Sequence, residues 1–148
     1  MRVPVPAFQK AVELLGRRSH FRRELEAKLV QRGYEASEVE AALSRLADRD
    51  LIDDRRTAHE FVRGRLARKA MGRPRLAHEL RARGVEPEVA EEVLAELYPD
   101  DDLDLARRAA RGARGSRETV ARRLDRLGFS GRSIVAVLEE LEDGDLHA

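Results

Sequence analysis

The segment Leu29-Val30-Gln31-Arg32-Gly33-Tyr34 places a Leu four residues before a Gly and an apolar residue directly after that Gly. The same spacing returns at residues 80–85, with Gly84, and at residues 124–129, with Gly128. A Gly just past a helix adopts the left-handed conformation at little steric cost, and the apolar residue after it folds back onto the last turn. A unit that recurs with unchanged internal spacing is typical of repeat proteins. The sequence therefore predicts three copies of one helical unit.

Apolar residues continue after each Gly at helical steps, as they do at Val39, Leu43 and Leu46. Steps of three and four residues place such side chains on one face of a helix. The signal for strands is nearly absent, because no segment alternates apolar and polar residues convincingly. We therefore predict an all-α fold of nine short helices, near residues 7–16, 21–32, 37–49, 54–70, 73–83, 87–97, 101–113, 116–127 and 130–142.

Helix starts are indicated by short oxygen-bearing side chains, which accept hydrogen bonds from exposed amides, and by Pro in the first turn. The candidates are Ser37, Asp53, Ser116, Ser130, and Glu86 before Pro87. Three helices with a tight turn between the second and the third resemble a helix-turn-helix arrangement. We expect an elongated array of three such repeats at residues 1–52, 53–99 and 100–148, the last with a short acidic tail.

The composition also favours several small cores. Of the 148 residues, 42% are hydrophobic and 39% charged, which is too apolar for a disordered chain and too charged for one large core. The chain has no Cys, which excludes disulfides and Cys-based zinc sites. It has no apolar run of membrane-spanning length and no secretory signal at its start. We expect a cytoplasmic monomer that does not contact a membrane.

Charge alternates in blocks along the chain, although the net charge is only +1. Residues 63–83 contain eight cations and one acid, Glu79, whereas residues 86–104 contain nine acids and neither Lys nor Arg. Residues 107–126 are basic again, and residues 139–145 are acidic. Such blocks form ordinary solvated faces, pairs between neighbouring helices, or a surface matched to a charged partner.

The basic block at residues 63–83 is the best candidate for binding. Several of its cations must be exposed, because they cannot all share one helix face with Phe61, Val62 and Leu66. Arg side chains bind phosphates or carboxylates through two parallel hydrogen bonds. The alternative is a solvated joint, and base stacking is not indicated, since no aromatic residues are interleaved. The candidate binding residues are Arg63, Arg65, Arg68, Lys69, Arg73, Arg75, Arg81 and Arg83.

No motif indicates catalysis or a metal. Residues 100–104 are rich in Asp, but a calcium loop that began at Asp100 would have Leu105 and Arg111 where Gly and Glu are needed. We interpret these acids as the first turn of a helix. In Leu51-Ile52-Asp53-Asp54 the paired acids are one candidate for binding a divalent cation, but we favour the interpretation that the two apolar residues pack into the first unit and an Asp caps the next helix. The four His residues lack metal-ligand spacing, and no phosphate-binding loop occurs. We expect no catalytic residues, no metal and no cofactor.

Three strings together resemble the RecX family of regulatory proteins, over roughly residues 10 to 142. They are Arg18-Ser19-His20-Phe21-Arg22-Arg23-Glu24-Leu25, continued by Lys28-Leu29 and Gly33-Tyr34; Leu51-Ile52-Asp53-Asp54; and Gly72-Arg73-Pro74-Arg75-Leu76, continued by Glu79-Leu80 and Gly84-Val85. The chain departs from the family pattern at Phe21, where Ser is usual, at Asp50, where Gly is usual, and at Thr57, where an aromatic residue is usual.

The resemblance implies a helical array that lies in the groove of the filament formed by the bacterial recombinase RecA on single-stranded DNA. It implies that RecA's ATP hydrolysis, strand exchange and co-protease activity are inhibited, as part of DNA repair and the SOS response, without catalysis by the modulator. One alternative is a free helix-turn-helix DNA-binding array. It is disfavoured because its third helices offer Glu38, Glu40, Glu91 and Glu92, which phosphate would repel, instead of base-reading residues. A general protein-interaction scaffold is a second alternative, and a hydrolase is a distant third.

Overall fold

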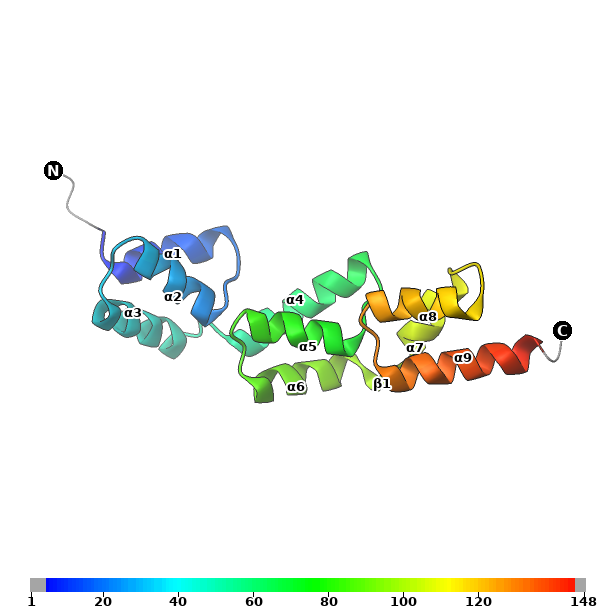
Figure 1. Cartoon of the computed structure of the whole chain (residues 1–148). Coiled ribbons are helices and arrows are strands. Elements are labelled where there is room, and N and C mark those ends of the chain that lie inside the picture. Colours follow the sequence, from blue (N-terminus) through cyan, green and yellow to red (C-terminus); the bar gives the residue numbers. More distant parts are fainter. Residues whose placement is uncertain (1–4, 146–148) are drawn as a thin grey trace.

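The computed structural model describes residues 5–145, with side chains to residue 142. In this part of the chain the elements are α1 (Ala7–Arg17), α2 (Arg22–Gln31), α3 (Ala36–Asp48), α4 (Asp54–Arg68), α5 (Arg73–Ala82), α6 (Pro87–Leu97), β1 (Pro99–Asp102), α7 (Leu103–Arg111), α8 (Arg117–Arg126) and α9 (Gly131–Asp145). The helices follow one another in groups of three along an elongated molecule (Figure 1). The predicted all-α class is confirmed, and four-residue β1 is the only strand among the described residues.

Each group of three helices encloses its own small core. Leu25, Leu29 and Leu43 lie in the first core, Leu76, Leu80 and Leu94 in the second, and Leu124 lies in the third. These seven side chains are almost fully buried. Burying one Leu contributes about 1.5–3 kcal/mol, so each core is a substantial part of the stability of its group. The boundaries after residues 52 and 99 stay predictions.

The turns after α2, α5 and α8 have the conformation that the spacing of Leu and Gly predicts. Gly33, Gly84 and Gly128 have positive φ angles of 94°, 87° and 80°. In each turn the amide of the next, apolar residue donates a hydrogen bond to the carbonyl of the Leu five residues earlier, at 3.1–3.3 Å. This is the bond that closes a Schellman motif, and it explains why the unit keeps its internal spacing.

The predicted helix starts are confirmed at three positions and wrong at one. Asp53, Ser116 and Ser130 each accept a hydrogen bond from a backbone amide three residues later, at 3.2–3.3 Å. Ser37 does not begin a helix, because α3 already starts at Ala36 and the carbonyl of Glu35 accepts its first intrahelical bond. Pro87 begins α6, but the Glu86 side chain makes no capping bond.

The largest error in the predicted helices lies in the acidic segment before α7. The prediction of a helix over residues 101–113, with its acids in the first turn, is wrong, because α7 begins at Leu103 and ends at Arg111. Asp101 has a positive φ of 54°, and residues 99–102 are extended as β1. Only Asp104 lies in the first turn of α7. The reason is that Asp102 accepts hydrogen bonds from the Arg73 amide of the second group and from Ser130 before α9 of its own group, which hold the segment out of the helix.

Candidate partner-binding surface

The turn glycines also form the joints between neighbouring helix groups. A Cβ atom added at Gly84 would lie 2.3 Å from Cδ of Arg23 on α2, and one added at Gly128 would lie 2.2 Å from Cβ of Arg75 on α5. The turn of one group therefore packs closely on the second helix of the group before it. The consequence is that α2, α5 and α8 meet end to end along the molecule.

A carboxylate completes each joint. Asp54 accepts a hydrogen bond from the backbone amide of Arg22 at 2.8 Å, and Asp102 accepts one from that of Arg73 at 2.9 Å. Both amides belong to the first residue of a second helix, where amides lack intrahelical partners and a negative charge is favourable. Burial raises the pKa of Asp54 above its ordinary value, although the bond from Arg22 lowers it.

Asp102 is the more deeply buried of the two carboxylates, with 1% of its surface exposed. Besides the Arg73 amide it accepts hydrogen bonds from the Ser130 amide at 2.9 Å, from the Ser130 hydroxyl at 2.8 Å and from the Ser133 hydroxyl at 2.5 Å. The amide of Gly72 also donates to the carbonyl of Leu127 at 2.9 Å. The joint between the second and the third group is thus closed by backbone and carboxylate bonds together.

The structure divides the eight candidate cations between different surroundings. The guanidinium groups of Arg65 and Arg83 lie 5.0 and 4.7 Å from the centre of the Phe61 ring. Arg68 and Arg83 line one surface hollow of 490 Å³ beside Phe61 and Phe21. These three arginines therefore lie around Phe61, and cation–π contact orients Arg65 and Arg83.

Acidic neighbours neutralise a further part of the block. Glu79 lies between two of its arginines, 3.5 Å from Nε of Arg65 and 3.8 Å from Nε of Arg75, and Arg73 pairs with Glu91 of α6. In the described part of the chain Arg63, Arg68, Lys69, Arg81 and Arg83 are exposed and form no ion pair. These five are the cations of the candidate set that remain available to a partner, and their role in binding stays a prediction.

Charge is sorted by the position of a helix within its group. Together, the three first helices contain ten Lys or Arg and four Asp or Glu, and the three second helices contain ten Lys or Arg and five Asp or Glu. The third helices, α3, α6 and α9, together contain only two Lys or Arg but twelve Asp or Glu. Figure 1 shows the third helices along the lower edge of the array, with α2, α5 and α8 above them. The molecule therefore has a basic side and an acidic side that run along its length.

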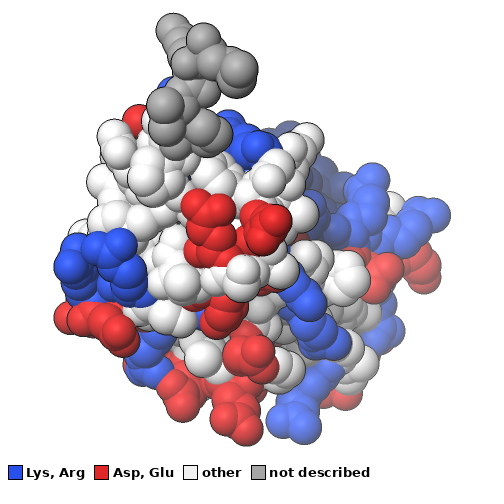
Figure 2. All heavy atoms as spheres, turned by 90° about the vertical axis from the view of Figure 1, so that its left-hand side faces the viewer, with Lys and Arg blue, Asp and Glu red and all other residues white. Residues whose placement is uncertain are grey.

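The N-terminal end of the array does not share this separation. Figure 2, which views the molecule from that end, shows basic and acidic side chains interspersed with neutral surface. Within the first group, Arg22 also pairs with Glu40 at 2.9 Å, and Arg18 with Glu24 at 2.7 Å. A partner that reads the charge pattern would therefore lie along the array.

Two residues that shape this surface were missed in the sequence. Phe21, which we noted only as a departure from a family pattern, is buried in the core of the second group, with its ring centre 6.0 Å from that of Phe61. Asp102 was assigned to a helix turn. The sequence did contain one signal. Asp54 and Asp102 occupy equivalent positions, each shortly after the end of a third helix.

The described residues contain no arrangement that indicates a catalytic or metal centre. No three His, Asp or Glu side chains among them are placed to hold a metal ion. His20 is buried, and its ring bonds to the Arg18 carbonyl and to Nζ of Lys28, both at 2.9 Å. In that same range no helix has the length and apolarity needed to cross a membrane.

Comparison with known proteins assigns the chain to a family. The family models for RecX, first three-helix domain, and RecX, second three-helix domain, match residues 7–46 and 53–94. This chain belongs to the RecX family. The predicted resemblance is thereby confirmed, and two of its three-helix units are matched independently.

Named relatives cover most of this RecX-family chain. It is 37% identical over 142 residues to Regulatory protein RecX of Halorhodospira halophila, with 91% of this chain and 88% of that protein covered. It is 33% identical to Regulatory protein RecX of Prosthecochloris aestuarii, with 91% and 93% covered. The crystal structure of RecX from Lactobacillus salivarius superposes with a TM-score of 0.81 at 22% identity, over 92% of this chain and 94% of the other. RecX relatives are regulatory proteins, and the fold is shared over the length of the array.

Proposed function

We propose that this RecX-family chain is a non-enzymatic regulator that binds the RecA–DNA filament and inhibits its ATPase, strand-exchange and co-protease activities. In this proposal it acts in the cytoplasm as a monomer, and it contacts RecA together with the single-stranded DNA inside the filament. It needs no cofactor. The observation that carries the proposal, beside family membership, is the sorting of charge into a basic side and an acidic side along an elongated array.

A filament offers both kinds of complementary surface. DNA presents one phosphate charge per nucleotide on each strand, and basic side chains that displace its counterions gain affinity. Acidic third helices are repelled by phosphate and are suited to basic protein surface. An array that lies along a filament groove would place its basic side toward DNA or acidic protein and its acidic side toward basic protein.

The proposal is tested by co-sedimentation with RecA filaments on single-stranded DNA. We expect the unmodified chain to sediment with the filament and the double variant Arg68→Glu with Lys69→Glu to sediment less, because both side chains are exposed and form no ion pair within the described residues. The double variant Arg17→Glu with Arg132→Glu makes the same change of charge at exposed positions outside the block. Failure of the unmodified chain to sediment would contradict the proposal.

A further inference from the structure

Arginines of the second helices come together at both joints of the array. At the first joint Arg23 of α2 and Arg81 of α5 line one groove of 430 Å³. At the second joint Nη1 of Arg75 on α5 donates a hydrogen bond, 3.1 Å long, to the carbonyl of Arg126 at the end of α8. The close packing of the turn glycines on Arg23 and Arg75 causes both approaches. A line of guanidinium groups therefore continues from one helix group to the next.

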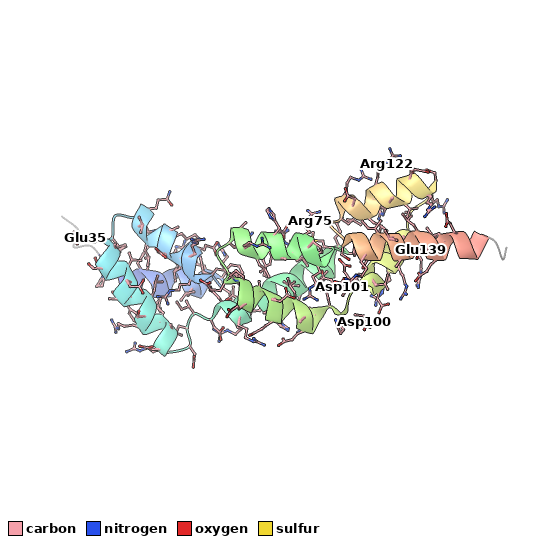
Figure 3. All side chains as sticks on the ribbon, turned by 60° about the horizontal axis from the view of Figure 1, so that its bottom comes forward. Glu35, Arg75, Asp100, Asp101, Arg122 and Glu139 are labelled. Carbon is pink, nitrogen blue, oxygen red and sulfur yellow. The ribbon has the colours of Figure 1, made fainter. Side chains whose placement is uncertain are left out.

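The line extends onto α8, in a part of the chain that neither matched family model covers. Arg122 and Arg126 are exposed and form no ion pair among the described residues, as do Arg23 and Arg81. Figure 3 shows Arg75 and Arg122 projecting from the same side of α5 and α8, with Asp100 and Asp101 on the opposite side of the joint. We call Arg23, Arg81, Arg126 and Arg122 the arginine ridge. Arg75, which Glu79 and the Arg126 carbonyl hold in place, lies between its two ends.

We propose that the arginine ridge binds the phosphates of a single strand of DNA along all three helix groups. Guanidinium groups bind phosphate through two parallel hydrogen bonds, and their succession along the array matches the regular row of phosphates on a strand. The described aromatic side chains are all buried or partly buried, so the bases have no exposed ring on which to stack. The ridge is therefore a binding surface for the DNA backbone without sequence preference.

The neighbouring acids set the position of the strand. The third helices carry ten acids among their described side chains, on the adjacent side of the array, and these repel phosphate, which keeps a strand on the ridge. Glu26 and Glu86 also line the groove at the first joint and weaken its attraction for phosphate. On α8 no acid is paired with Arg122 or Arg126. The strongest contact with DNA is thus at the third helix group, outside the basic block of residues 63–83.

This inference rests on the proposed function for its class of partner, but it is tested without RecA. The probe is a fluorescent oligothymidylate, and the measurement is its anisotropy with the full chain at several salt concentrations. Each phosphate contact on a single strand contributes about −0.7 to the slope of log K against log salt. The double variant Arg81→Gln with Arg122→Gln should bind at least ~10-fold more weakly at low salt, and its slope should be less steep by about 1.4.

The matched control is Arg17→Gln with Arg111→Gln, which removes the same charge from exposed positions away from the ridge. Arg111 lies on the side of α7 toward Glu140 of α9. We expect this control to keep the slope of the unmodified chain. Equal losses in both variants would overturn the ridge, because affinity would then follow net charge alone. Absence of DNA binding by the unmodified chain at low salt would also overturn it and would favour an acidic protein partner for these arginines.

Discussion

The carboxylate of Asp102 accepts a hydrogen bond from the backbone amide of Arg73, 2.9 Å away, and so caps a helix of the preceding group from the start of the next. Asp54 makes the same bond to the amide of Arg22. The joints of the array are therefore built from one device that is used twice. The second joint adds bonds from Ser130 and Ser133 to the same carboxylate.

Replacing Asp102 by Ala should lower the free energy of unfolding by about 3 kcal/mol, because buried donors that lose a charged acceptor remain unsatisfied. The measurement is urea denaturation followed by circular dichroism. Asp100→Ala is the control, since Asp100 is exposed and its side chain makes no hydrogen bond in the described structure; it should change the free energy by less than about 0.5 kcal/mol. Equal effects of the two substitutions would contradict the role of Asp102.

Two Gly→Ala substitutions should change the free energy of unfolding in opposite directions. A Cβ at Gly72 would lie 2.1 Å from the carbonyl oxygen of Gly128, so Gly72→Ala must separate the second joint and should destabilise by about 1–3 kcal/mol. Gly64 lies inside α4 with open space around it, so Gly64→Ala should stabilise by about 1 kcal/mol. The measurement is the midpoint of urea denaturation of each variant, compared with that of the unmodified chain. A Gly72→Ala variant as stable as the unmodified chain would rule out the close backbone contact.

The stability of the first group should fall in mild acid because of His20. Burial lowers the pKa of His20 below its ordinary value of 6.5, the bond to the Arg18 carbonyl raises it less, and the charges of Arg18 and Lys28 lower it further. The unfolded chain then binds more protons than the folded chain below about pH 6.5, so stability is fully present above that pH and declines as the pH falls toward the lowered pKa.

The check on His20 is the free energy of unfolding at about pH 7 and at about pH 5 for the unmodified chain and for His20→Gln. We expect a smaller decrease between these pH values in the variant, whatever its absolute stability, because Gln does not titrate. The neutral ring fits both neighbours, because Nδ1 donates to the Arg18 carbonyl and Nε2 accepts from Nζ of Lys28. Identical decreases in both proteins would show that His20 does not cause the pH dependence.

The sequence predicted what is local within a helix group and missed what joins the groups. The Leu and Gly spacing determines the turns at Gly33, Gly84 and Gly128, since a Schellman turn needs only residues within one segment. The burial of Asp102 and Phe21 depends on contacts with segments about 30 to 40 residues away, which periodicity does not report. That α2, α5 and α8 lie on the same side of the array follows from the packing at the joints, which the sequence does not show.

In the candidate site, too, the sequence missed the effect of contacts between different helices. A run of cations in the sequence is one block, but in space Glu79 and Glu91 neutralise Arg65, Arg73 and Arg75, and the packing of Phe61 gathers Arg83 with Arg65. Helix period alone separates the faces of one helix, and neighbouring helices decide which face remains free. The sequence therefore identified a basic region but not which of its arginines are available.

The most direct test of the account is the rate of ATP hydrolysis by RecA that is already assembled on single-stranded DNA, titrated with this chain. We predict a dose-dependent decrease that is complete well below one molecule of the chain per RecA. The double variant Arg68→Glu with Lys69→Glu should require a higher concentration for the same decrease. An unchanged rate at saturating concentrations of the unmodified chain would contradict the claim that it regulates the RecA filament.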